Sequence, residues 1–140
     1  MIFFFLLLII IFFFSCNRKT EFIDSKAVGG LFLIKNPPKE DSLLKKEIMH
    51  FLIKNPPKLE GKITHIDFYK YSWNTKYFLN HKEDRGGFSS EELGNYPEDD
   101  LASFIISKCK TDTTKLVGRF HFYGNRSNLS QLDTIIYKCD

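Results

Sequence analysis

The side chains that could do chemistry are scattered along this chain rather than gathered in a motif. Histidine is the usual proton-transfer group and metal ligand, and the four histidines stand far apart at His50, His65, His81 and His121. None falls in an HExxH pair or a Cys–His zinc spacing, and there is no CxxC. His65 and His121 could meet on neighbouring strands as a metal pair, but strand histidines are more often surface residues held by hydrogen bonds. We therefore predict no metal site and no cofactor.

Carboxylates gather in one segment, residues 83–100, which carries seven Asp and Glu side chains against one arginine. The strongest acid–base or Ca²⁺-binding candidates in it are Glu91, Glu92, Asp99 and Asp100. Oxygen ligands bind Ca²⁺, but the regular DxDxDG spacing is missing. Acid–base catalysis needs carboxylates held at a fixed separation in a cleft. The segment is interpreted as a solvated loop. A small hydrolase using these carboxylates with His81 or His121 is the alternative.

Motifs for covalent or phosphate chemistry are missing. The chain contains no GxSxG nucleophile elbow, no GxxxxGK[ST] and no GxGxxG. Lys and Arg number 20 against 17 Asp and Glu, a net charge of +3 in 140 residues. That balance excludes a strongly basic nucleic-acid protein. We expect a protein that is not an enzyme and does not bind nucleic acid.

An aromatic strand offers the best binding surface in the sequence. Residues 63–73 read ITHIDFYKYSW and alternate as a strand does. Tyr69, Tyr71 and Trp73 share one face, and such side chains dominate binding hot spots. The same three side chains would equally suit a strand packed beneath a helix.

The first residues form an apolar run that is too short to span a bilayer. Residues 2–14 are thirteen apolar residues without interruption. As a helix they would reach about 20 Å, whereas a bilayer core is about 30 Å thick. A secretory signal core of about 7–15 apolar residues fits this length.

A cysteine follows the apolar run directly, in the order Phe13, Phe14, Ser15, Cys16. This resembles the lipobox of bacterial lipoproteins, with Phe13 and Ser15 where the family usually has Leu and Gly or Ala. The resemblance covers residues 1–16 only. It implies a signal peptide over residues 1–15, cleavage before Cys16, and a lipid on the Cys16 thiol. The protein would then be anchored in a membrane of the bacterial cell envelope, on the periplasmic or surface side.

Two further cysteines remain if Cys16 carries lipid. Cys109 and Cys139 end two predicted strands in an oxidising compartment, which favours a disulfide. Across a flat middle strand their Cα atoms would be about 9.5 Å apart, while bridged Cα atoms lie within about 6.8 Å. The bridge therefore requires the strand ends to converge; two free thiols are the alternative.

The elements that would position these residues suggest an α+β fold. Residues 16–26 form a polar tether, and residues 27–140 form a single domain. Residues 41–53 predict an amphipathic helix, capped by Asp41 or Ser42. Strands are expected at residues 27–34, 63–73, 101–110, 115–123 and 132–139, with a helical turn at 89–93. We expect a mostly antiparallel sheet of about five strands, with one principal amphipathic helix on one face.

The octapeptide FLIKNPPK occurs twice, at residues 32–39 and 51–58. We interpret the first copy as a strand and the second as the last turn of the helix, each ended by its prolines. In the first strand, the pair Gly29-Gly30 indicates a bulge or a close approach of another backbone.

These observations predict a lipid-anchored protein of the bacterial cell envelope. Its domain would be a non-catalytic binding or interaction module for an envelope protein or polymer. Besides the hydrolase, a toxin-neutralising immunity-type lipoprotein is an alternative, because the acidic segment would suit a basic toxin.

Overall fold

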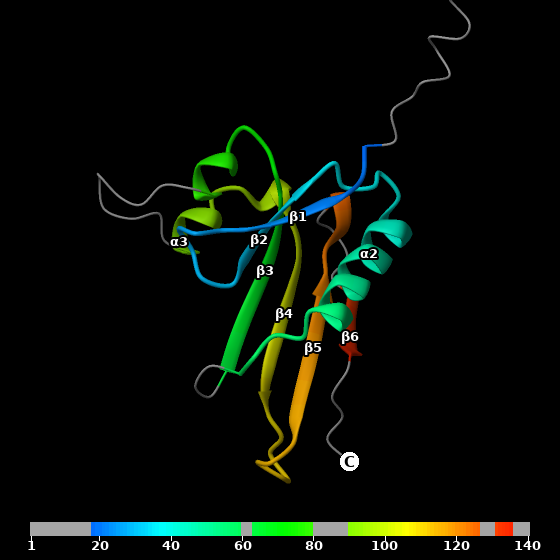
Figure 1. Ribbon diagram of the computed structural model, residues 1–140, viewed down its shortest axis with the longest axis vertical. Helices are drawn as coiled ribbons and strands as arrows, with labels where there is room; N and C mark the ends of the chain where they lie inside the picture. The colour runs from blue at the N-terminus through cyan, green and yellow to red at the C-terminus, as the bar shows by residue number, and fades with distance from the viewer. Residues whose placement is uncertain (1–17, 60–62, 80–89, 127–130, 136–140) are drawn as a thin grey trace, which may run out of the picture.

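A six-stranded sheet with one long helix across one face forms the frame of the molecule (Figure 1). The computed structural model describes residues 18–59, 63–79, 90–126 and 131–135. The strands are β1 (Glu21–Asp24), β2 (Leu31–Lys35), β3 (Ile63–Lys70), β4 (Asp100–Lys108), β5 (Leu116–Phe122) and β6 (Gln131–Ile135). The helices are α2 (Asp41–Lys54) and the short α3 (Ser90–Leu93), and single 3₁₀ turns form η1 (Lys76–Leu79), η2 (Pro97–Asp99) and η3 (Gly124–Arg126).

The sheet is mixed, and it has one more strand than expected. Its spatial order follows the chain from β1 to β6. β2 and β3 are parallel, while the other neighbouring pairs are antiparallel. The parallel pair arises because α2 carries the chain back along the sheet before β3 begins. The α+β class is therefore confirmed, whereas the expectation of a mostly antiparallel sheet of about five strands is corrected.

The additional strand, β1, lies inside the segment predicted to be a tether. Glu21 pairs with Lys35 and Asp24 with Phe32, so β1 is an edge strand of the sheet. Phe22, on the α2 side, stacks on Phe51 of the helix with ring centroids 4.3 Å apart. The folded domain consequently begins before residue 27, and the polar stretch 16–26 is not a free tether throughout.

Gly30 explains why β2 starts later than predicted. The chain turns at residues 25–30, where the Ser25 hydroxyl accepts hydrogen bonds from the backbone N–H groups of Ala27 and Val28. Gly30 has φ +76°, and a Cβ there would lie 2.4 Å from the carbonyl oxygen of His65. The predicted close approach of another backbone is confirmed at Gly30.

Helix α2 closes the main core. Leu44, Ile48 and Leu52 are fully buried against the sheet, as the amphipathic pattern predicted. The predicted cap is wrong: the N-cap residue is Glu40, without a side-chain hydrogen bond. The Asp41 carboxylate instead accepts hydrogen bonds of 2.9 Å from the backbone and side-chain N–H groups of Asn125. It therefore ties the start of α2 to η3.

A second cluster covers part of the other face. Its buried members are Leu31, Leu33, Tyr69, Phe78 and Leu93. The last two come from η1 and α3, which lie on this side of the sheet. The predicted helical turn near residues 89–93 is thus present as α3, and it shields one end of the face.

The C-terminal strands form the predicted meander β4–β5–β6. The repeated octapeptide also behaves as predicted: its first copy runs through β2 and its second through the end of α2. Within the described part of the chain, no helix is long and apolar enough to cross a membrane.

Candidate functional site

The three aromatic residues predicted to form a binding surface do not share one. Tyr69 is only 7% exposed, within the second cluster. Tyr71 is half-buried, with the Lys35 ammonium 4.9 Å from its ring centroid. Trp73 is 74% exposed. The predicted strand face therefore divides into a core residue, a covered residue and an exposed residue.

A turn after Lys70 causes this division. The Thr75 hydroxyl donates to the Lys70 carbonyl (2.6 Å) and accepts from the Ser72 N–H (2.9 Å). These bonds end the strand, so the two-residue alternation stops before Tyr71. The sequence signal for this turn was the Ser72 and Thr75 pair, whose hydroxyls bond to nearby backbone.

A row of polar residues crosses the sheet on the face opposite α2. Asp67, Ser103 and His121 are direct cross-strand neighbours on β3, β4 and β5. A nucleophilic relay needs histidine between serine and acid. Here the serine stands in the middle, and its hydroxyl lies 3.2 Å from the Tyr123 hydroxyl. The row does not form a catalytic triad.

Two carboxylates of this face, Asp67 and Asp100, have raised pKa values. Burial raises the pKa of Asp100 to about 7, and the nearby Asp67 carboxylate adds to the rise. Burial also raises the pKa of Asp67, although His65 opposes it. Among the described residues, Asp100 Oδ1 is buried without a hydrogen-bond partner. Sequence reasoning missed Asp67, whose signal was an acid on the same strand face as Tyr69.

Apart from Asp100, the candidate carboxylates of the acidic segment do not assemble into a site in its described part. Glu91, Glu92 and Glu98 are exposed. Asp99 is buried and accepts a 2.5 Å hydrogen bond from the Ser72 hydroxyl. Residues 80–89, including His81, lie outside the described residues. No group of three or more His, Cys, Asp or Glu in the described ranges could hold a metal ion.

Of the three cysteines, the structure describes only Cys109. Cys109 is 2% exposed, directly after β4, and it is disulfide-bonded. Its predicted partner Cys139 lies outside the described residues, and so does Cys16. The pairing of Cys109 with Cys139 and the lipid on Cys16 stay predictions.

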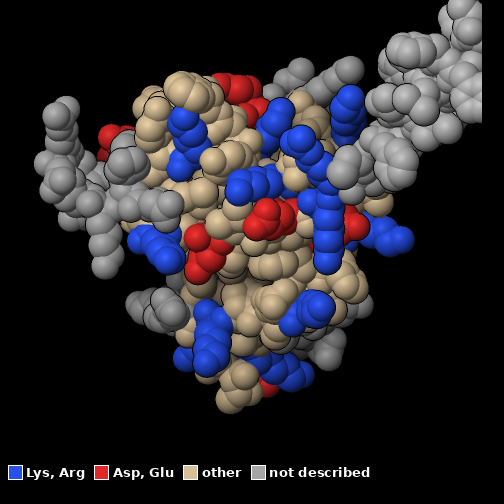
Figure 2. Space-filling view, turned by 45° about the horizontal axis from the view of Figure 1, so that its top comes forward, with Lys and Arg blue, Asp and Glu red and all other residues tan. Residues whose placement is uncertain are grey.

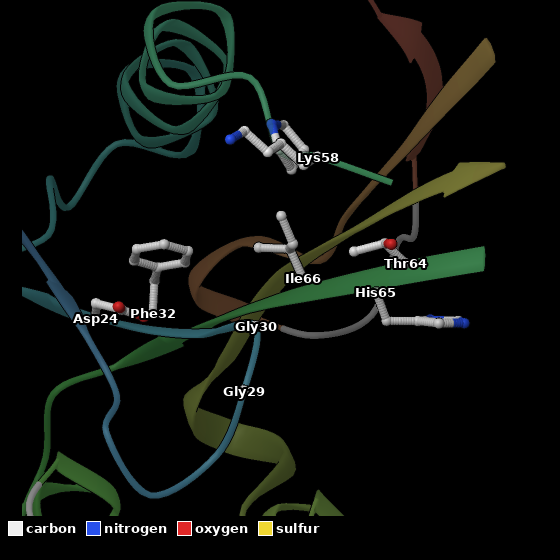
Figure 3. A pocket seen from close by; sticks show the side chains of 9 residues that line it. Asp24, Gly29, Gly30, Phe32, Lys58, Thr64, His65 and Ile66 are labelled. Carbon is white, nitrogen blue, oxygen red and sulfur yellow. The ribbon is translucent and has the colours of Figure 1, made fainter. Parts of the chain in front are cut away.

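A pocket of about 440 Å³ lies where β2 stops short beside β3. The pairing of these strands starts at Leu31 and Asp67, so no described strand accompanies residues 63–66 of β3 on that side. Figure 3 shows Phe32, Thr64 and Ile66 pointing to the side from which Lys58 approaches, while the His65 ring points the other way.

On the side of β3 that faces this pocket, no described strand pairs with the backbone of His65. Asp67 N–H and Tyr71 N–H both donate to carbonyls of the β2 segment, Gly30 and Ile34. The backbone groups of every second residue in a strand point to the same side. The N–H and carbonyl of His65 therefore face the β2 side, as those of Asp67 do. The position of Gly30 against the His65 carbonyl agrees with this orientation. The edge therefore offers backbone groups beside an apolar wall.

Comparisons with protein-family models, with curated proteins and with solved structures find no match to this chain.

Proposed function

We propose that this chain is a lipid-anchored protein of the bacterial cell envelope whose domain is a non-catalytic binding module. The partner is an extended segment of an envelope protein, which binds along the open edge of β3. The observation that carries this proposal is the pocket at that edge, where no described strand accompanies the backbone of His65 and apolar side chains lie beside it. The lipobox-like residues before and at Cys16 support the proposed location in the cell envelope.

An extended polypeptide suits both parts of the pocket. Strand addition satisfies backbone donors and acceptors, and alternate side chains of the added strand enter pockets on one face. Phe32 and Ile66 offer the apolar contact on the α2 side. Asp24 and Lys58 on the rim of the pocket carry opposite charges. The pocket therefore has little preference for the net charge of the partner segment. We expect the partner segment to alternate apolar and polar residues.

The test uses the full chain in detergent micelles and a library of peptides with that alternation. His65→Pro removes the N–H that faces the pocket, and we expect it to abolish binding. His65→Ala is the matched control, because the imidazole points away from the pocket (Figure 3). Bound peptide should also slow hydrogen exchange at the His65 amide of the unchanged protein. Equal loss in both variants, or an unprotected amide, would overturn the proposal.

Acid–base hydrolysis is a second candidate, with Asp100 of the acidic segment and Asp67 of β3 as the carboxylates. The observation that favours it is the pKa of Asp100, raised to about 7 by burial and by Asp67. A general acid or base is most effective near the working pH. A panel of ester, peptide and glycan substrates should then be cleaved by the unchanged protein and not by Asp100→Asn. Inactivity of the unchanged protein removes this candidate.

A further inference from the structure

The chain enters the folded domain very close to the predicted anchor. Glu21 is already paired with Lys35 in the sheet. Just before it, the Lys19 carbonyl accepts a hydrogen bond from the Asn36 side chain, and the Thr20 hydroxyl donates to the Asn36 carbonyl. Three residue steps separate Lys19 from Cys16, which span at most about 11 Å. If Cys16 carries lipid, as proposed above, this end of the sheet must lie near the bilayer.

The same end carries the most exposed aromatic side chain among the described residues. Trp73 is 74% exposed and Tyr77 is 39% exposed. The Lys76 ammonium lies 2.9 Å from the Trp73 ring centroid and 5.0 Å from that of Tyr77. Trp and Tyr gather at membrane–water interfaces because their rings are apolar with a polar edge. Lysine beside them suits anionic headgroups.

Contacts connect this aromatic turn to the chain entry. Lys35, the partner of Glu21, lies over the Tyr71 ring, and the Tyr71 N–H donates to the Ile34 carbonyl. Trp73 follows two residues later. Figure 1 shows the start of β1 and the turn after β3 at the same end of the sheet, opposite the β4–β5 turn.

Basic residues stand beside the aromatic side chains at this end. Lys76 lies over the Trp73 ring and Lys35 over the Tyr71 ring, and Arg18 and Lys19 come shortly before β1. Figure 2, in which this end is turned toward the viewer, shows Lys and Arg side chains spread over it with a few Asp and Glu among them. Each basic residue near an anionic surface favours binding about fivefold.

We propose that this end of the domain docks on the bilayer that holds the lipid of Cys16. Trp73 and Tyr77 enter the headgroup layer, and Lys35 and Lys76 bind anionic headgroups. In that orientation the β4–β5 turn points away from the membrane. The open edge of β3 then faces the surrounding compartment, where a partner segment can reach it.

The experiment uses Trp73 as the probe, because it is the only tryptophan in the chain. The full, lipid-modified chain is placed in vesicles of phosphatidylglycerol and phosphatidylcholine with brominated acyl chains, which quench nearby tryptophan. We expect quenched and blue-shifted Trp73 emission. Lys35→Glu with Lys76→Glu should lower the docked fraction at least about fivefold. Lys108→Glu with Lys110→Glu, the same charge change at the opposite end, should leave the quenching unchanged.

The outcomes separate this inference from the proposed anchor. Mass spectrometry of the same sample reports whether Cys16 carries lipid. Lipid on Cys16 with unquenched Trp73 overturns docking and leaves the anchor standing. Equal loss of quenching in the two charge-reversed proteins also overturns docking, since net charge alone would then explain it. An unmodified Cys16 removes the anchor and this inference with it.

Discussion

At the scale of single residues, Gly30 is the position where backbone geometry is most demanding. Its φ of +76° and its contact with the His65 carbonyl leave no room for a Cβ. We expect Gly30→Ala to lower the free energy of unfolding by about 2–3 kcal/mol. Gly29→Ala is the control, because nothing lies within 4 Å of its Cβ position. Urea unfolding of both proteins measures the difference, and equal effects would contradict this reading of the turn.

Asp100 gives a pH dependence whose sign follows from its raised pKa. The pKa is about 7 in the folded protein against an ordinary value of 3.8, so the folded state binds the extra proton between these values. Stability should therefore fall as the pH rises from about 4 to 7 and then level off. Asp100→Asn should remove this fall and gain about 1–2 kcal/mol above pH 7, less than the full shift because the carboxyl is partly exposed.

Urea unfolding at several pH values checks the Asp100 prediction. Asp112→Asn is a control of opposite sign, because hydrogen bonds from Thr114 hold the pKa of Asp112 below its ordinary value. That protein should lose stability relative to the unchanged chain once the pH exceeds about 4. Identical pH profiles for the unchanged protein and Asp100→Asn would show that the titration of Asp100 has no effect on folding stability.

At the scale of elements, the link between α2 and η3 is carried by one asparagine. The backbone N–H and the side chain of Asn125 both donate to the Asp41 carboxylate, and the side chain also donates to the carbonyls of Pro38 and Lys39. We expect Asn125→Ala to cost about 1–2 kcal/mol, because the start of α2 loses the side-chain bonds and keeps only the one from the backbone N–H. Glu40→Ala should cost much less, since Glu40 makes no side-chain cap bond. Thermal unfolding of the two variants provides the comparison.

A disulfide between Cys109 and Cys139 is the second prediction at this scale. Peptide mapping without reductant should find Cys109 joined to Cys139. Such a bridge closes a loop of about 30 residues and should stabilise the domain by roughly 3–4 kcal/mol in the chain-entropy model. Reduction should lower the unfolding temperature accordingly. Two free thiols at these positions would refute the pairing.

At the scale of the whole molecule, the proposed membrane anchoring depends on the thiol of Cys16. We expect the unchanged chain to incorporate labelled palmitate and to sediment with membranes. Cys16→Ser should stay unprocessed and unlabelled, because the acyl acceptor is gone. Cys109→Ser is the control, since that cysteine is disulfide-bonded and should not affect labelling. Label on the Cys16→Ser protein would refute the assignment.

The sequence predicted the local elements well but the candidate site poorly. The Leu44, Ile48 and Leu52 stripe located α2, and the alternation near Phe120 located β5. The same alternation, extended past Lys70, put Tyr71 and Trp73 on a face they do not share. Strand periodicity says which residues alternate, but not where hydrogen bonds from a turn stop the strand.

The repeated octapeptide shows most directly what the sequence by itself determined. Its prolines end an element in both copies, and the flanking patterns indicated a strand for one and a helix for the other, as found. Only the tertiary structure decided that β2 and β3 pair in parallel, that β1 joins the sheet, and that Asp67 lies near enough to raise the pKa of Asp100. The physical reason is the separation along the chain of the residues that interact. Turns and periodicity act between near neighbours, whereas strand pairing and the field between two carboxylates depend on residues brought together only when the chain folds.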